Sequence, residues 1–159
     1  MQRAEKGASQ LDRKCALNRY KDGRRNERIG MNLIERLCDH LEFLGLGTCN
    51  TDETAGDLFW GILPDSPDRA LAVMSVDSSF GGSAAGARIQ IFTRGAPGQV
   101  RVPYEWSVAV AEELEGFSGF LGGDGPRVSI EAISVAEGAG TDTSGRHLYV
   151  SNYRVRYCG

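Results

Sequence analysis

The first clear pattern along the chain is helical, with leucines recurring every three or four positions. These leucines are Leu33, Leu37, Leu41 and Leu44. Asn32 can cap such a helix, Glu35 completes a capping box, and Gly45 is a typical helix end. The opposite face carries polar residues: Glu35, Arg36, Asp39, His40 and Glu42. The pattern predicts an amphipathic helix that packs on a sheet and keeps its polar face, His40 included, in water.

Three stretches with strand character follow, at residues 57–63, 70–76 and 88–94. In the third stretch, apolar residues alternate with polar or mixed ones, which is typical of a strand with one buried face. Turn-forming residues at 64–68 join the first two stretches, and a glycine-rich link at 78–86 precedes the third. This succession predicts a meander.

A second helix is predicted around Pro103, because proline is well tolerated in a first helical turn. Its expected core face is formed by Val108, Ala111, Leu114 and either Trp106 or Val110. Two final strands, at residues 127–135 and 147–157, flank a glycine-rich segment at 136–145. The order α-β-β-β-α-β-β predicts an α+β fold, with a largely antiparallel or mixed sheet of about five strands and two helices packed on one side.

The composition fits one globular domain, since 41% of the 159 residues are hydrophobic and 25% are charged. The apolar runs are far shorter than the roughly 20 residues needed to cross a bilayer. The start of the chain lacks the apolar core of a secretory signal, so we expect the protein to be made and kept in a cytoplasm.

Charge divides the chain into two parts. Residues 1–30 hold 9 Lys+Arg and 4 Asp+Glu, a net charge of +5, while residues 31–159 hold 9 and 17, a net charge of −8. The first part has little apolar surface to bury, and we expect a disordered basic leader, or a start assigned too far upstream of Met31. Residues 31–159 are predicted to be a single domain. Nucleic-acid binding by the basic segment stays an alternative, although Tyr20 is its only aromatic residue.

The candidate chemistry is sparse. The four cysteines form no CxxC pair, so free thiols are expected, with a Cys38–Cys49 disulfide left open. Cys38 and His40 lie two positions apart and do not share a helix face, which makes a poor metal chelate. Neither His40 nor His147 lies in a catalytic motif, and no glycine pattern matches a phosphate loop. We predict no metal, cofactor, small-molecule substrate or enzyme activity. A small Cys/His hydrolase with a reactive Cys38 or Cys49 is the enzymatic alternative.

Three passages occur in a recognisable order. The first is the opening helix, leading into Leu44 and Gly45. The second is PDSPDRALAV at 64–73, followed by a small-residue link and the strand IQIFTRG at 89–95. The third is GRHLYVSNYRVRY at 145–157, with the Pro103 helix between it and the second passage. Together they resemble the tail-terminator and minor capsid (neck) proteins of siphophage-like particles, and the resemblance covers essentially all of residues 31–158.

Members of this family form rings, commonly hexameric, at the head-proximal end of the tail tube. The resemblance implies a virion protein of a phage tail or neck, assembled in the host bacterial cytoplasm, that ends tail polymerisation and offers a surface for head joining. Its partners would be its own copies, the tail-tube protein and a head-connector protein, with DNA only passing through the ring. Another neck role, such as head completion, remains open.

We expect the subunit contacts of such a ring in the long loops at 78–87, 117–125 and 136–145, and in strand arginines that can pair with acids of a neighbour. The candidate interface residues are Arg88, Arg94, Arg154, Arg156, Phe80 and Phe120. Such ring contacts are heterologous, so that one face of a subunit complements a different face of the next.

Overall fold

The computed structural model describes residues 33–76 and 87–157. The basic leader at 1–30, Asn32 and Phe80 lie outside the described residues. The elements in chain order are α2 (Leu33–Phe43), β1 (Leu58–Trp60), β2 (Ala70–Ser75), β3 (Ala87–Arg94), α3 (Arg101–Leu114), β4 (Ser118–Phe120), the 3₁₀ turn η2 (Leu121–Gly123), β5 (Arg127–Thr141) and β6 (His147–Tyr157). None of the helices in this part of the chain is long and apolar enough to cross a membrane.

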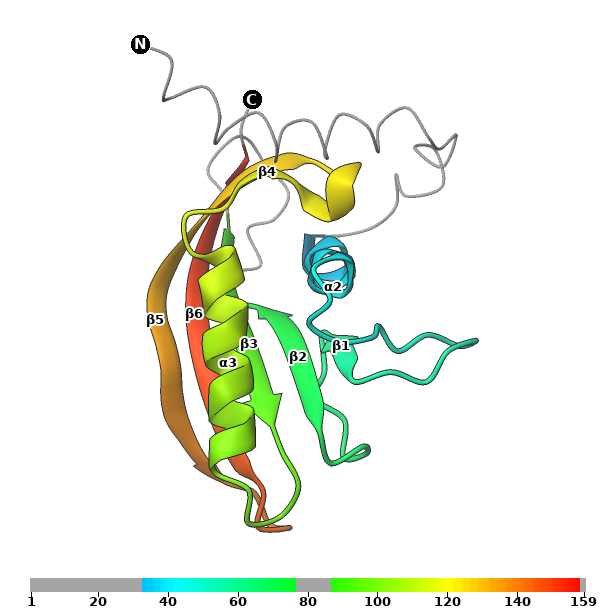
Figure 1. Cartoon of the computed structure of the whole chain (residues 1–159), viewed down its shortest axis with the longest axis vertical. Helices are drawn as coiled ribbons and strands as arrows, with labels where there is room; N and C mark the ends of the chain where they lie inside the picture. The colour runs from blue at the N-terminus through cyan, green and yellow to red at the C-terminus, as the bar shows by residue number, and fades with distance from the viewer. Residues whose placement is uncertain (1–32, 77–86, 158–159) are drawn as a thin grey trace.

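The strands form one sheet in the order β1-β2-β3-β6-β5-β4, with the helices α2 and α3 against one of its faces (Figure 1). The pair β1/β2 is parallel and the other pairs are antiparallel. The predicted α+β class, the helices on one side and the mixed sheet are confirmed. The sheet has six strands rather than about five, because β4 forms within the predicted loop at 117–125.

The predicted meander is wrong at its first step. The strand predicted at 57–63 spans only Leu58–Trp60, and it runs parallel to β2, with Leu58 beside Leu71. The turn-rich residues 64–68 do not make a tight hairpin. They are held away from β1 by two buried arginines described below. The second step, from β2 to β3, is antiparallel as predicted.

The loop predicted at 136–145 is largely strand, because β5 continues to Thr141 and pairs with β6. The register slips at three places along this pair, between Ala132 and Thr141. Each slip is a bulge that places extra residues in β5, which lets a glycine-rich stretch stay paired while the strand bends. Only residues 142–146 then lie between the two strands, as the turn of a long hairpin.

Helix α2 forms as the leucine spacing predicts, and Leu33, Leu37 and Leu41 are buried against the sheet. Gly45, at φ +77°, ends the helix. The backbone N–H of Leu46 then donates to the Leu41 carbonyl at 3.0 Å, the long bond of a Schellman motif.

His40 does not lie on the water-facing side of α2, as the sequence pattern predicts, but is 1% exposed. The backbone N–H of Gly122 in η2 donates to its Nδ1 at 2.9 Å, and the Phe117 ring lies 4.6 Å from the imidazole. The prediction failed because η2 folds over α2 from a distant part of the sequence. Burial lowers the pKa of His40 to about 4.

Helix α3 contains Pro103 in its first turn and buries Trp106, Val110, Ala111 and Leu114. Val108, predicted in the core, is only half-buried, since Val110 takes the inward position. The Trp106 indole N–H donates to the Leu46 carbonyl at 2.9 Å, which ties α3 to the chain after α2. The Arg69 guanidinium lies 3.7 Å above the Trp106 ring.

Candidate functional site

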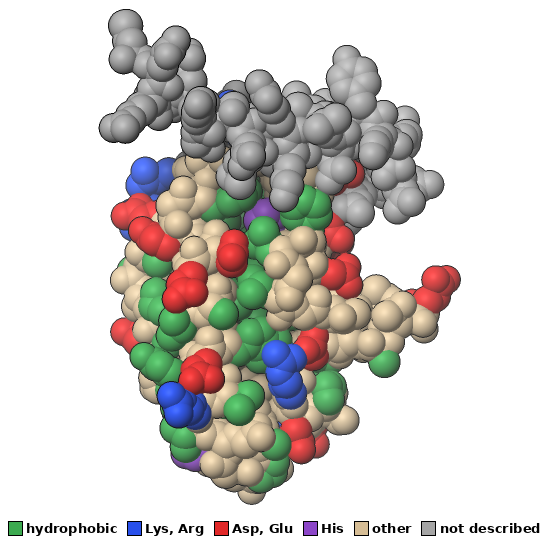
Figure 2. Space-filling model, in the orientation of Figure 1, with side chains coloured by type: hydrophobic (Ala, Val, Ile, Leu, Met, Phe, Trp, Pro, Cys, Tyr) green, Lys and Arg blue, Asp and Glu red, His purple; other side chains and the backbone are tan. Residues whose placement is uncertain are grey.

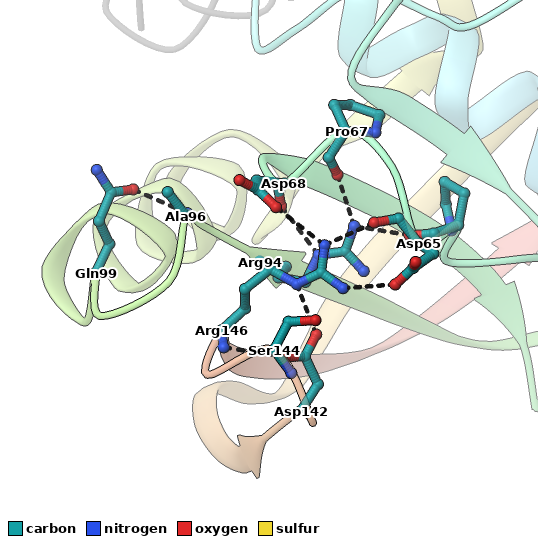
Figure 3. Close-up of polar contacts among 10 residues, drawn as sticks. Asp65, Pro67, Asp68, Arg94, Ala96, Gln99, Asp142, Ser144 and Arg146 are labelled. Atoms are coloured by element: carbon teal, nitrogen blue, oxygen red, sulfur yellow. Dashed lines mark hydrogen bonds and ion pairs between the residues drawn. The ribbon is translucent and has the colours of Figure 1, made fainter.

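Two arginines hold the β1–β2 connection at one end of the sheet, and we call them the arginine clamp: Arg94 at the end of β3 and Arg146 before β6 (Figure 3). Arg94 is 3% exposed, and its guanidinium donates to the carbonyl oxygens of Pro64 at 2.7 Å, Pro67 at 2.6 Å and Asp68 at 2.9 Å. Burial lowers the pKa of Arg94.

Arg146 binds the same connection through the carboxylates of Asp65 and Asp68 and the Asp65 carbonyl, at 2.6 Å, and it also binds Asp142 of its own hairpin. It is 4% exposed and donates to Asp65 Oδ1 at 2.8 Å, Asp68 Oδ1 at 3.1 Å and Asp142 Oδ2 at 2.8 Å. The Arg146 backbone N–H also donates to Asp142 Oδ1, and this bond lowers the pKa of Asp142. The bond with Asp65 in turn raises the pKa of Arg146.

One residue of the arginine clamp, Arg94, is also a predicted interface residue. Arg94 is 3% exposed and its guanidinium donates to three carbonyls of its own chain, so little of this side chain is available for contact with another molecule. Arg94 shares the alternation of its strand with Arg88, but the residues 64–68 fold over it. Arg94 therefore holds the fold together. Arg146, which the sequence analysis missed, does the same.

A second group of arginines lies on the sheet face opposite α2 and α3, and we call it the arginine patch: Arg88, Arg127, Arg154 and Arg156. Strand register places them there. Arg88 pairs with Arg154 across β3 and β6, Arg156 pairs with Ser129 on β5, and Arg127 lies two residues before Ser129 on the same face. Three of these residues are predicted interface residues. Arg127 was missed because only the register reveals its neighbours.

The arginine patch has little counter-charge of its own. Arg154 approaches Glu131 at 3.8 Å, a loose contact between partly exposed side chains. In the described part of the chain, neither Arg88, Arg127 nor Arg156 forms an ion pair. Arg154 and Arg156 line a hollow of about 150 Å³, which also touches Ser118 of β4 and Ser129 of β5. Like charges directly opposite on neighbouring strands destabilise a sheet, so the patch costs stability in the isolated chain.

The connection between α2 and β1 projects beyond the edge of the sheet, and we call residues 50–56 the acidic arm (Figure 1). Its neck is closed by backbone bonds, from Asn50 N–H to the Leu58 carbonyl and from Asp57 N–H to the Thr48 carbonyl, both at 2.9 Å. Gly56 is required in this neck, because a Cβ there would overlap the Thr48 carbonyl oxygen.

The tip of the acidic arm is a turn in which the Thr51 N–H donates to the Thr54 carbonyl at 2.8 Å and the Thr54 N–H donates back to Thr51 Oγ1 at 2.9 Å. The arm is thus fixed in shape although it is surrounded by solvent. Asp52 and Glu53 stand exposed at this tip, and neither forms an ion pair with a described residue. Figure 2 shows acidic side chains at the end of this projection.

Large apolar side chains are exposed at both edges of the sheet. Trp60 and Ile62, at and after β1, are 44% and 64% exposed, and Ile133 and Val135 on β5 are 43% and 40% exposed. Along its outer edge, β5 pairs with β4 at Arg127–Ser129, and residues 115–117 then hydrogen-bond to Ile130 and Ala132. Beyond Ala132, the described residues place no strand beside this edge. Both edges therefore combine apolar contact area with backbone at a sheet edge.

The other predicted interface residues differ in exposure. Arg88 and Arg156 are exposed, Arg154 is half-buried, and Phe120 is half-buried in β4. Phe80 lies outside the described residues. Their contact with another subunit stays a prediction.

The thiols of Cys38 and Cys49 lie in contact, with their Sγ atoms 3.4 Å apart. The hydrogen bond with Cys49 and burial raise the pKa of the Cys38 thiol, which disfavours the nucleophilic thiolate at this position. Among residues 33–76 and 87–157, no group of three or more His, Cys, Asp or Glu could hold a metal ion.

The fold and these surfaces define a class: a small α+β domain with one helix-covered sheet face, one face bearing clustered arginines, and two apolar edges. No protein-family model matches the sequence. No curated protein matches it either. Among solved structures, a chain described as "Virion of native gene transfer agent (GTA) particle" is similar, at 13% sequence identity and a TM-score of 0.48, over 85% of this chain and 92% of that chain. Both values are too low for this likeness to show a function.

Proposed function

We propose that the chain is a structural protein of a phage-like particle that associates with copies of itself and caps the head-proximal end of a tail tube. The observation that carries the proposal is the pair of unlike sheet edges. Trp60 and Ile62 mark one edge, and Ile133 and Val135 mark the other. Unlike, apolar edges on one subunit favour head-to-tail contacts, which close into a ring when the rotation between subunits allows it.

The position of such a ring, at the head-proximal end of a tail tube, is proposed from the sequence resemblance. The ordered passages at 33–45, 64–95 and 145–157 resemble those of tail-terminator and neck proteins, whose rings end tail growth and give the head a docking surface. By this proposal the chain is a virion component whose partners are its own copies, the tail-tube protein and a head-connector protein. A different neck role is the nearest alternative, since it uses the same self-association with another neighbour.

The Cys/His hydrolase alternative has less support. Its candidate nucleophile Cys38 is buried, with a raised pKa, and His40 on the same helix is engaged by the Gly122 N–H. His147 lies beside Thr141 on the far hairpin, with its Nδ1 3.4 Å from the Thr141 hydroxyl. Among the described residues, no hydrogen bond joins either histidine to the Cys38 or Cys49 thiol, as a general base would require.

The test of the proposal is the assembly state of the full chain, measured by multi-angle light scattering and by electron microscopy, alone and with purified tail tubes. We expect rings at high protein concentration, or rings on tube ends. Replacing Ile62 by Asp should reduce association at least tenfold. Val102→Asp, at an exposed valine on α3 away from both edges, is the matched control and should not. A chain that stays monomeric and leaves tube ends uncapped would refute the proposal.

A further inference from the structure

The acidic arm and the arginine patch are complementary in charge but lie on different sides of the same molecule. The arm leaves the chain beside β1, the first strand of the sheet, and the patch spreads over β3, β6 and β5 on the face away from the helices. We propose that the acidic arm of one copy docks on the arginine patch of the next copy. The inference rests on the proposed function, because it specifies the contact through which the proposed ring forms.

Charge is the first argument. The domain at 31–159 has 17 acidic and 9 basic residues, a net charge of −8, yet four of its nine arginines gather on one face. Arg88 and Arg154 face each other directly, and Glu131 is the one acid near them in the described chain. Such a patch lowers its energy when an anionic partner supplies the missing carboxylates.

Preorganisation is the second argument. The acidic arm is closed at its neck by two backbone bonds and at its tip by the Thr51–Thr54 pair, so its shape is fixed before any partner binds. The Gly56 N–H also donates to the Asn50 side chain at 3.2 Å. A segment held in its bound shape loses little conformational entropy on docking, so the arm is suited to carry Asp52 and Glu53 to a partner.

The hollow of the patch is the third argument. The hollow has a volume of about 150 Å³, and Arg154, Arg156, Ser118 and Ser129 line it together with Glu131. The Glu131 carboxylate lies 3.8 Å from Arg154, so Arg156, which has no ion-pair partner among the described residues, is the guanidinium that an incoming carboxylate would meet. A guanidinium binds a carboxylate with two parallel hydrogen bonds, which fixes the direction of approach. Because arm and hollow lie at different places on one subunit, the contact is heterologous and can propagate around a ring.

The decisive experiment uses two charge-reversed forms of the full chain, an arm variant (Asp52→Lys with Glu53→Lys) and a patch variant (Arg154→Glu with Arg156→Glu). Sedimentation velocity should show each of them monomeric at concentrations where the unaltered chain assembles, with association at least tenfold weaker. Glu112→Lys with Glu113→Lys on the exposed side of α3 is the matched control for the arm variant, since both raise the net charge by 4, and it should assemble normally.

Mixing the two variants distinguishes a head-to-tail contact from a symmetric one. In an equimolar mixture the native arm meets the native patch and the lysine arm meets the glutamate patch, so a head-to-tail contact should restore rings in which the two variants alternate, whereas a symmetric contact should stop at heterodimers. A chain that carries all four substitutions should assemble again, since lysines then meet glutamates. Circular dichroism and thermal melts within about 3 °C of the parent show that each variant is folded, as expected for surface substitutions.

The outcomes separate this inference from the proposed function. If the parent chain forms rings and the arm variant forms them equally well, the docking contact is wrong and the proposed function stands. If the parent chain never assembles, both are wrong. If the patch variant loses affinity for a short DNA duplex while the arm variant still assembles, the arginine patch serves nucleic acid, and the inference is overturned.

Discussion

Two groups of arginines in this domain share the same side chain but differ in burial and in their hydrogen-bond partners. In the arginine clamp, Arg94 and Arg146 are nearly inaccessible and donate to the connection between β1 and β2. In the arginine patch, Arg88 and Arg156 reach into solvent without an ion-pair partner among the described residues. Burying a guanidinium is tolerable only when its donors are satisfied, whereas an exposed one keeps its binding capacity for another molecule. Burial and the number of satisfied hydrogen-bond donors, rather than residue type, therefore distinguish the arginines that stabilise the fold from those of the candidate interface.

The largest expected effect tests the buried half of this comparison. Arg94→Ala removes three hydrogen bonds from a charged donor and leaves the carbonyls of Pro64, Pro67 and Asp68 without their partner. We expect a loss of about 3 kcal/mol in the free energy of unfolding. Arg94→Lys should recover only part of it, because an ammonium group does not reproduce the planar fork. Urea denaturation measures the change.

The matched control for Arg94 is Arg88, which lies six residues earlier on the same face of β3. If Arg94→Ala costs no more than Arg88→Ala, the clamp contributes nothing and the comparison fails.

His40 extends the comparison between buried and exposed polar groups, because it is buried but only one of its two ring nitrogens has a described hydrogen-bond partner. Its Nδ1 accepts the Gly122 N–H, while its Nε2 has no described partner. Burial holds the pKa of folded His40 at about 4, below the 6.5 of an unfolded histidine. Between these two pH values the unfolded chain binds more protons than the folded chain. The contribution of neutral His40 to the stability of the fold is therefore complete above pH 6.5 and is lost as the pH falls toward 4. The difference corresponds to about 3 kcal/mol at pH 4.

Thermal melts between pH 7 and pH 4 measure this loss. His40→Asn keeps an acceptor near the Gly122 N–H but does not titrate, so this variant should lose less stability over the same interval. Equal pH dependence in the two proteins would show that groups other than His40 cause the loss of stability between pH 7 and pH 4.

The two contacting thiols give a smaller contrast of the same kind. Cys38 is 1% exposed with a raised pKa, and Cys49 is accessible in part. At pH 8 we expect an alkylating agent to modify Cys49 at least tenfold faster than Cys38, since the thiolate is the reactive form. Peptide mapping after timed quenching measures both rates, with the Cys49→Ser variant as control. Rapid alkylation of Cys38 would instead revive the hydrolase alternative.

The sequence predicts the fold well where the pattern is local. The leucine spacing of α2, the alternation in β3 and the position of Pro103 each depend on residues within one element, and all three elements form. β4 and the distal part of β5 were missed, because their small and glycine residues gain strand geometry only from pairing with a distant strand. The parallel direction of β1 was missed as well, because it is defined by pairing with β2 and not by any pattern within residues 58–60.

The candidate site was predictable to a similar extent. Alternation along β3 and β6 identifies Arg88, Arg154 and Arg156 as outward-facing, but the same alternation also selects Arg94. What buries Arg94 is a connection some 30 residues away in sequence, which no local pattern reveals. Arg127 and the acidic arm were missed for the same reason, since their roles arise from register and from the closed neck.

The smallest expected effect tests the exposed half of the comparison. Arg88→Ala removes a charge that faces Arg154 across the sheet and that has no partner among the described residues. We expect the free energy of unfolding to change by at most about 0.5 kcal/mol, in the stabilising direction, because cross-strand repulsion is relieved. The gain should shrink in 1 M salt, where the Debye length is about 3 Å. A clear loss of stability would mean that Arg88 has a structural partner, and the arginine patch would then resemble the clamp.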